Sequence, residues 1–338
     1  MATAPAHDPM IPPAEAPAFL AANGWEGCEI RPLAGDASFR RYFRVHLGEE
    51  TAVLMDAPPE KEDVGPFLRI AEHLLDRGFA PPRPLAVDRE LGLLLLEDFG
   101  DDRIAPMLQR EPEREEEVYS DAVDVAIRLA RQPAPDDVKP YDQAALRRET
   151  TLFVDWYTPA LGLEVDLDGY DRAWDEALAG VLAETARRPV LVLRDFHADN
   201  LMVVPWLGQL GLLDFQDARA GHRAYDLVSL LQDARRDVSP ELEARMLDRF
   251  LAGAGIADHD AFRAHYEVLG AQRNAKILGI FTRLWKRDGK PAYPAMQPRI
   301  WRYVERNLAH PALAPVKAWF DANVPPEARG DAVARLAR

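Results

Sequence analysis

The chain contains very little cysteine and no long apolar run. Cys28 is the one cysteine among 338 residues, so no disulfide can form within the chain, and this favours a reducing compartment. The segment Met1–Pro17 is rich in alanine and proline and lacks the apolar stretch of a signal peptide. Apolar runs such as Leu91–Leu96 are far shorter than the about 20 residues that cross a bilayer. We therefore expect a cytoplasmic protein with no membrane partner.

Positive charge is also scarce. The chain has 41 Lys and Arg against 56 Asp and Glu, which gives a net charge of −15. Nucleic-acid backbones and anionic membranes are bound by clustered basic side chains, so we expect neither as a partner. The apolar fraction of 48% is ample for a core, and the length suits one large two-lobed domain or two modest ones. The sequence carries no signal for an oligomeric state.

The first hundred residues are rich in strand patterns. Alternating apolar segments bounded by turns predict a pair of strands within residues 31–47 and further strands at Thr51–Met55, Pro84–Val87 and Leu91–Glu97. Together they predict a five-stranded antiparallel sheet. The apolar spacing over Val64–Arg77 predicts one helix, which ends at Gly78.

After Asp98-Phe99-Gly100 the apolar period becomes helical. The segments with this period are Tyr119–Gln132, Ala144–Tyr157, Tyr170–Arg187, Tyr225–Arg235, Pro240–Ala254, His259–Leu284 and Met296–Leu308. We therefore predict an α+β fold with a β-rich N-lobe at residues 1–98, a hinge at 99–103 and an α-rich C-lobe at 104–338.

The most informative segment carries Asp195, Asn200 and Asp214. An Asp followed by an Asn five residues later, with a second Asp at the end of an apolar run, is the layout of a phosphoryl-transfer site. Val190–Leu193 and Leu210–Leu213 are expected to form short buried strands that share one hairpin around this loop. In this interpretation Asp195 receives the proton of the attacking hydroxyl, while Asn200 and Asp214 bind Mg²⁺. The alternative is that these residues only terminate turns and strands.

Two N-terminal segments are candidates for binding the nucleotide. Residues 33–45 could form a loop over phosphates, because small residues let backbone N–H groups approach an anion. Its candidate ligands are Gly35, Ser38, Arg40 and Arg41. The segment has a single glycine, and an ordinary hairpin turn is the alternative. Glu97 and Phe99 lie where a linker that binds adenine is expected, although a buried edge strand gives the same pattern.

These motifs resemble the aminoglycoside phosphotransferase family, which has a protein-kinase-like fold. The likeness covers about residues 20 to 310. It rests on Gly35–Val45, Leu94–Gly100, Asp195–Asn200, Asp214–Ala218 and Tyr225–Leu227. The resemblance implies that ATP and Mg²⁺ are used and that Asp226 supports the catalytic loop.

Within the family, two further segments resemble the anomeric N-acetylmuramate/N-acetylglucosamine 1-kinases of cell-wall recycling. They are Met55–Glu60 and Gln272–Phe281. The implied reaction is ATP-dependent phosphorylation of the C1 hydroxyl of a small amino sugar. A kinase of another alcohol, such as an aminoglycoside or choline, and a nucleotide sensor without turnover are the alternatives.

The sequence departs from the family pattern at two positions. Met55 stands about where the family has a lysine that binds the ATP phosphates, and Leu193 replaces a histidine before the catalytic Asp. The missing positive charge could come from Arg40, Arg41 or Lys61.

The acceptor is expected to bind to the helical lobe. The candidate residues are His197, Asp217, Arg273, Lys276 and Trp285. A basic stretch in an acidic protein would suit the lactyl carboxylate of N-acetylmuramate, whereas an aminoglycoside would favour carboxylates. Structural roles are the alternative for His197 and for the basic stretch, and a polar turn is the alternative for Asp217.

Overall fold

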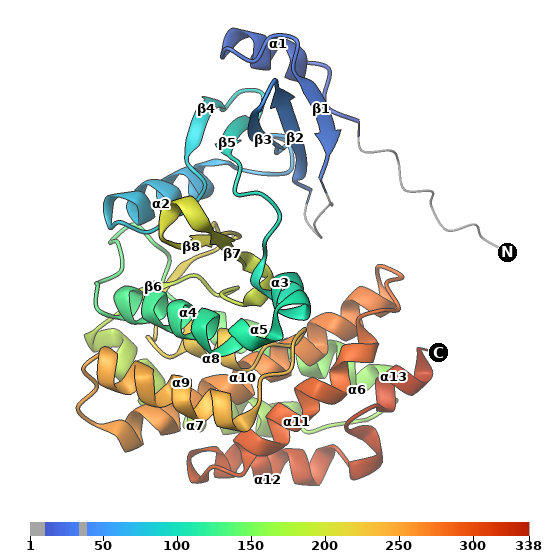
Figure 1. The fold of residues 1–338 in the computed structure, drawn as a ribbon. Helices are drawn as coiled ribbons and strands as arrows, with labels where there is room; N and C mark the ends of the chain where they lie inside the picture. Colours follow the sequence, from blue (N-terminus) through green and yellow to red (C-terminus); the bar gives the residue numbers. More distant parts are fainter. Residues whose placement is uncertain (1–10, 34–38, 338) are drawn as a thin grey trace, which may run out of the picture. The chain divides into compact units, whose positions relative to one another are not determined.

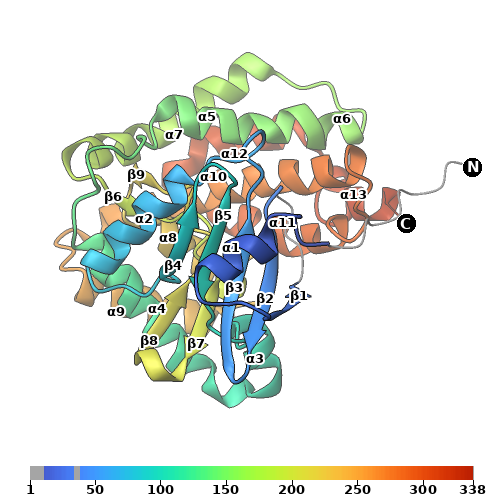
Figure 2. The same cartoon turned by 90° about the horizontal axis from the view of Figure 1, so that it is seen from above.

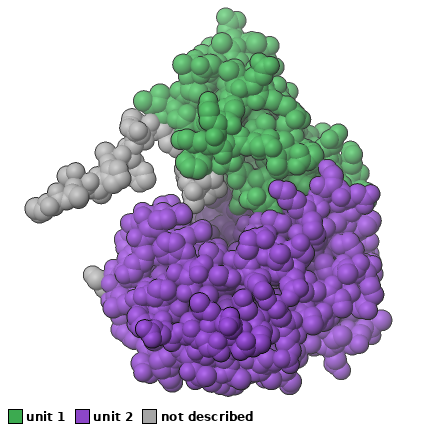
Figure 3. Space-filling view, turned by 180° about the vertical axis from the view of Figure 1, so that it is seen from behind, with its two compact units in different colours: residues 1–102, 202–217 green, residues 103–201, 218–338 purple. Residues whose placement is uncertain are grey.

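The computed structural model describes residues 11–33 and 39–337, so Gly35 and Ser38 lie outside the described residues. The chain forms two compact units, shown in Figure 3. Unit 1 comprises residues 1–102 and 202–217, and unit 2 comprises residues 103–201 and 218–338. Residues 202–217 thus belong with the N-terminal residues. The boundaries 1–98, 99–103 and 104–338 remain a prediction.

Unit 1 contains the expected five-stranded antiparallel sheet, in the order β1-β2-β3-β5-β4 (Figure 1). Its strands are β1 (Glu29–Pro32), β2 (Arg41–Leu47), β3 (Glu50–Asp56), β4 (Pro84–Asp88) and β5 (Leu93–Glu97). The register places Arg41 opposite Asp56 and Leu54 opposite Leu95. The sheet and the helical remainder of the chain confirm the predicted α+β class.

The apolar residues of the central strands pack beneath helix α1 (Ala16–Ala22). Figure 2 shows this helix lying across the strands. Phe43, Val45, Leu54 and Leu95 are almost completely buried in this cluster. Because alternate side chains of a strand share one face, the period-two pattern of the sequence is what builds this core.

Helix α2 (Gly65–Asp76) follows the apolar spacing of the sequence. It ends where Gly78 adopts a φ of +74°, a left-handed conformation that glycine enters at little cost. Phe67 of this helix stacks on Phe215, with ring centroids 4.9 Å apart. The helix therefore packs against the residue that follows Asp214.

The prediction of a single hairpin around the catalytic loop is wrong. β6 (Val190–Val192) pairs with β9 (Arg219–Gly221), and β8 (Gln209–Leu212) forms a separate sheet with β7 (Leu201–Val204). The cause is local: a second apolar strand begins directly after Asn200, and the turn before β8 ends at Gly208, whose φ is +63°. A backbone bond of 2.8 Å from Leu212 to Ala80 ties β8 into unit 1.

Unit 2 is helical apart from β6 and β9. Its α-helices are α3 (Ile104–Arg110), α4 (Glu115–Ala130), α5 (Gln143–Leu152), α6 (Thr158–Ala160), α7 (Leu167–Arg187), α8 (Tyr225–Leu231), α9 (Pro240–Gly253), α10 (His259–Lys286), α11 (Gln297–Leu308), α12 (Ala314–Asn323) and α13 (Ala332–Leu336). Of these, α3, α6, α12 and α13 were not predicted. A π-helical turn, Phe153–Tyr157, continues α5.

Helix α10 is the centre of unit 2, because its middle part is buried on every side. It packs against α5, α8 and α11. A Cβ atom at Gly279 would lie 2.3 Å from the backbone carbonyl of Leu152, so this close approach of two helices requires glycine. No helix in the described part of the chain is long and apolar enough to cross a membrane.

Candidate active site

The loop after β6 holds Asp195 in a constrained backbone turn. Arg194, the preceding residue, has a φ of +72°, and the Asp195 N–H donates to the Leu193 carbonyl at 2.9 Å. A left-handed conformation is costly for a residue with a side chain, and it persists where surrounding contacts fix it. Such strain is typical of functional loops.

Asp226 at the start of α8 supplies part of that fixation. Its two carboxylate oxygens accept the backbone N–H groups of Leu193 and Arg194 at 2.8 and 2.9 Å. The Ser229 hydroxyl, one turn further along, donates to the Arg194 carbonyl at 3.1 Å. Burial raises the pKa of Asp226 to about 7, although the two backbone hydrogen bonds act against the rise. The contacts support the loop role that the resemblance implies for Asp226.

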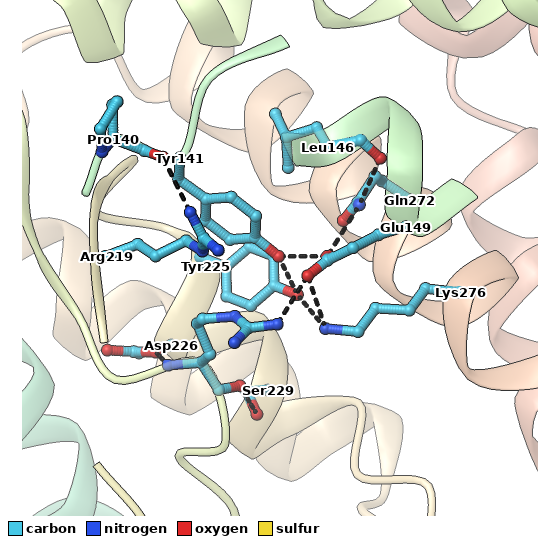
Figure 4. Close-up of polar contacts among 11 residues, drawn as sticks. Pro140, Tyr141, Leu146, Glu149, Arg219, Tyr225, Asp226, Ser229, Gln272 and Lys276 are labelled. Atoms are coloured by element: carbon cyan, nitrogen blue, oxygen red, sulfur yellow. Dashed lines mark hydrogen bonds and ion pairs between the residues drawn. The ribbon is translucent and has the colours of Figure 1, made fainter. Parts of the chain in front are cut away.

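The Arg194 side chain ends in a buried charge cluster around Glu149. Figure 4 shows Glu149 with Tyr141, Tyr225 and Lys276 around it. Its guanidinium donates to Glu149 of α5 at 2.6 Å, and Lys276 of α10 lies 3.2 Å from the same Glu149 oxygen. The Tyr141 hydroxyl donates to the other Glu149 oxygen and is 2.9 Å from the Tyr225 hydroxyl. Burial alone would raise the pKa of Glu149, but Lys276 and Arg194 hold it below its ordinary value. Glu149 is therefore ionised, and its contacts connect α5 with α10 and with the catalytic loop.

Asp195 itself is partly buried among positive charges. Burial alone would raise its pKa, but Lys276 and Arg273, with a smaller contribution from Arg194, hold it below its ordinary value. The carboxylate is thus ionised at neutral pH and can accept a proton or hydrogen bond from a hydroxyl group.

Asn200 and His197 complete the loop. The Asn200 amide nitrogen donates to the Asp195 carbonyl at 3.0 Å, which makes its Oδ1 the atom suited to a cation. The Nε2 atom of buried His197 lies 3.2 Å from an Arg235 nitrogen and 3.5 Å from the Asn200 amide nitrogen. Because both neighbours are donors, Nε2 accepts and the ring proton is on Nδ1. Burial lowers the pKa of His197, which keeps the ring neutral.

The other candidate for the metal, Asp214, belongs to unit 1. It follows β8 with a φ of +57°. The Gln216 amide donates to its Oδ1 at 2.7 Å, and an Arg40 nitrogen lies 3.8 Å from the same oxygen. Arg194 and Asp214 are the described non-glycine residues with a positive φ. Backbone strain thus coincides with both ends of the predicted motif.

Within unit 1 the three cations that could replace the missing lysine have different partners. Arg41 donates to Asp56 at 2.7 Å, and the Lys61 ammonium lies 4.8 Å from the centre of the Phe39 ring. Arg40 faces Asp214, as described above. Met55 is fully buried in β3. Arg40 is therefore the one of these three cations that lies beside a predicted metal ligand, and its binding to phosphates remains a prediction.

The two linker candidates have different environments. Phe99 is buried against Met202 and Val204, and its ring would lie 2.7 Å from a Cβ atom at Gly211. Glu97 ends β5 and is partly exposed. Their roles in binding a nucleotide remain predictions.

The acceptor candidates lie in different environments. Arg273 and Lys276 are buried in α10, while Trp285 near the end of that helix is half-buried and has the Lys286 ammonium 4.0 Å above its ring. Asp217 is exposed in unit 1. Their assignment to the acceptor remains a prediction.

Sequence reasoning missed Glu149. A signal was present, because Ala145, Leu146 and Phe153, which share its face of the helical pattern, are apolar and buried. A charged residue on an apolar face needs a buried partner. The sequence could have indicated this need, although not the identity of the partner.

A second cluster in unit 2 has the composition of a metal site. Ligand atoms of Glu184, His222 and His265 lie within 4.8 Å of one another. However, His222 Nδ1 accepts the Ala224 N–H at 3.1 Å, so the ring proton is on Nε2, the atom that faces Glu184. Arg223 also binds Glu184 at 2.7 Å. We interpret this cluster as a structural link between α7, α10 and the turn that joins β9 to α8.

The fold and the loop define a phosphotransferase of the kinase-like type, and sequence comparison gives the family. Residues 29–265 match the phosphotransferase enzyme family, APH. The chain therefore belongs to this family, as the motifs predicted.

Two relatives with assigned names match most of the chain. An N-acetylmuramate/N-acetylglucosamine kinase of Caulobacter vibrioides is 38% identical over 92% of this chain and 96% of its own length. A kinase of the same name from Pseudomonas aeruginosa is 38% identical over 88% of this chain and 90% of its own length.

A solved structure supports the fold. A choline/ethanolamine kinase family protein of Mesorhizobium loti superposes with a TM-score of 0.58 at 18% identity, over 90% of this chain and 98% of that one. At this identity the match concerns the fold alone.

Proposed function

We propose that this protein is an ATP-dependent kinase that phosphorylates the anomeric C1 hydroxyl of N-acetylmuramate and N-acetylglucosamine in cell-wall recycling. The observation that carries the proposal is the 38% identity to kinases of that name over most of the chain. The geometry of Asp195 is consistent with it, because an ionised carboxylate on a fixed loop suits a hydroxyl acceptor.

In the proposed reaction the C1 oxygen attacks the γ-phosphorus of ATP in line with the departing ADP. The new bond joins the C1 oxygen to the γ-phosphorus, and the bond between the γ-phosphorus and the oxygen that bridges it to the β-phosphate breaks, so ADP leaves. Asp195 orients the hydroxyl and receives its proton. An anomeric hydroxyl is more acidic than an ordinary alcohol, so a carboxylate with a low pKa is a sufficient base.

Mg²⁺ is expected to accompany ATP. Asn200 and Asp214 offer the amide and carboxylate oxygens that this ion prefers, and the Asn200 amide nitrogen is already used by the Asp195 carbonyl. When bound, the ion would neutralise phosphate charge. Arg40 would add a fixed positive charge beside Asp214, in place of the absent lysine.

The test is ADP release from ATP and Mg²⁺ with N-acetylmuramate, N-acetylglucosamine, kanamycin and choline in parallel. Asp195→Asn serves as the control, because it keeps the shape of the side chain and removes its basicity. We expect turnover with the two amino sugars, loss of most of it in the control, and retained ATP binding. Phosphorus NMR of the product should show the phosphate on C1.

Turnover with kanamycin or choline alone would refute the proposed acceptor class. Equal turnover by wild type and Asp195→Asn would refute the role of Asp195.

A further inference from the structure

Two basic side chains of α10, Arg273 and Lys276, are buried inside unit 2. Lys276 is bound to Glu149 and lies 3.4 Å from the Tyr225 hydroxyl, and Arg273 is 4% exposed. The charge of Lys276 is thus already opposed by Glu149 within unit 2. A cation that recognises an acidic acceptor is therefore better sought on the open side of the catalytic loop.

A cavity of about 380 Å³ lies beside that loop. It is lined by Ala105, Gln109, Asp199, Arg235, Arg236, Asp237 and Arg299, all in unit 2. The volume is within the range of small-molecule sites. Asp199 is the residue before Asn200, so the cavity borders the predicted catalytic loop directly.

The lining arginines are not equivalent. Arg299 binds Asp237 through two nitrogens, each at 2.7 Å, and Arg236 binds Glu115. Arg235 has no such close ion pair among the described residues, since Asp199 is 3.8 Å from its Nε and His197 accepts from it as a neutral ring. Its side chain is 38% exposed. Arg235 is therefore the cavity cation with charge available to a ligand.

Arg235 is also fixed to the catalytic loop. Buried Asp233 accepts the Arg235 backbone N–H at 2.8 Å with one oxygen and the Ala198 N–H at 3.4 Å with the other. The side chain reaches back to His197 at 3.2 Å. Two independent links thus hold the guanidinium next to the loop that carries Asp195.

We propose that Arg235 binds the lactyl carboxylate of N-acetylmuramate and so sets the preference of this kinase between its two sugars. The inference rests on the proposed function. N-acetylglucosamine has a hydroxyl where N-acetylmuramate has the lactyl ether, so the two acceptors differ in the group that Arg235 would bind. A guanidinium pairs well with a carboxylate, because its N–H groups form a planar fork.

The experiment compares kcat/KM for the two sugars in wild type, Arg235→Ala and Arg235→Lys. The Ala variant should lose about 10- to 100-fold with N-acetylmuramate, the range for a hydrogen bond to a charged group. Its kcat/KM with N-acetylglucosamine should stay near the wild-type value. The Lys variant should fall between, since it keeps the charge and loses the fork. Arg302→Ala, which removes an exposed arginine bound to Asp237, is the matched control and should leave the sugar ratio unchanged.

An equal loss with both sugars would overturn the inference and assign Arg235 to the shared loop geometry. A raised KM for ATP with an unchanged sugar ratio would also overturn it, because the bound anion would then be a nucleotide phosphate. An unchanged ratio with unchanged rates would show that Arg235 binds neither. Wild type that phosphorylates neither sugar would refute the proposed function first, and that outcome is seen before any variant is made.

Discussion

Glu149 accepts a hydrogen bond of 2.6 Å from Arg194, the residue that precedes Asp195. This bond joins a helix in the middle of unit 2 to the strained turn of the catalytic loop. Lys276, 3.2 Å from the same oxygen, gives Glu149 a second positive neighbour. A buried charge that loses its partner is costly, so the arrangement couples the position of Asp195 to the packing of α5 and α10.

The first prediction concerns Glu149→Gln. The substitution leaves Arg194 and Lys276 facing an uncharged side chain, so we expect the free energy of unfolding to fall by about 3 to 5 kcal/mol. We also expect kcat to fall by about tenfold or more in the folded enzyme, because the fixation of the Arg194 turn is weakened. Urea unfolding and steady-state kinetics at a temperature where the variant is folded measure the two effects.

A double variant separates positioning from stability. Glu149→Gln with Lys276→Met removes one of the two uncompensated cations, while the ion pair between residue 149 and Arg194 stays absent. Stability should recover in part and kcat should stay low. Recovery of kcat together with stability would mean that Glu149 only balances charge.

The second prediction concerns Arg40. Its side chain lies 3.8 Å from Asp214 in unit 1, and we expect it to bind the ATP phosphates in place of the absent lysine. Arg40→Ala should raise the KM for ATP by about 10- to 100-fold and leave the KM for the sugar nearly unchanged. Lys61→Ala, which removes a cation that lies over the Phe39 ring, is the control. An ATP affinity equal to that of wild type in Arg40→Ala would contradict the role.

The third prediction is a pH dependence that arises from Asp226. Its pKa is about 7 in the folded protein, whereas an unfolded Asp titrates near about 3.9. Between these values the folded state binds a proton that the unfolded state releases. The contribution of this group to stability is therefore fully present below about pH 4 and is lost as the pH rises through about 7.

Urea unfolding of wild type and Asp226→Asn between pH 5 and 8 measures this effect. The stability of wild type relative to the variant should decrease with rising pH, by at most about 1.4 kcal/mol per pH unit. In the same range wild-type kcat should rise, because the ionised carboxylate accepts both loop N–H groups, while the kcat of Asp226→Asn should stay low and nearly flat. Parallel stability curves for the two proteins would show that Asp226 does not titrate in this range.

The sequence by itself determined the class of fold and the position of the motif. Apolar residues at every second position predicted the five-stranded sheet, and apolar residues with a period of 3.6 predicted the long helices. Both spacings show which face of a strand or helix is buried, and both can be seen in a short stretch of sequence. The spacing of Asp195, Asn200 and Asp214 indicated phosphoryl transfer, and the motifs gave the family. Local patterns did not reveal α3, α6, α12 and α13, or that β6 pairs with β9 and not with β8.

Only the tertiary structure decided which charges are available to a ligand. Glu149, Arg194 and Lys276 are far apart along the chain, and the sequence shows three ordinary charged residues. Folding brings them together in a buried cluster. In this cluster Lys276, which was predicted from the sequence as a candidate to bind the acceptor, is paired with Glu149. Arg235, in contrast, lies in a cavity with its charge incompletely paired. The spacing of apolar residues indicates which face of a helix or strand a side chain lies on. Which side chain it pairs with on that face depends on packing between segments that are far apart in the sequence.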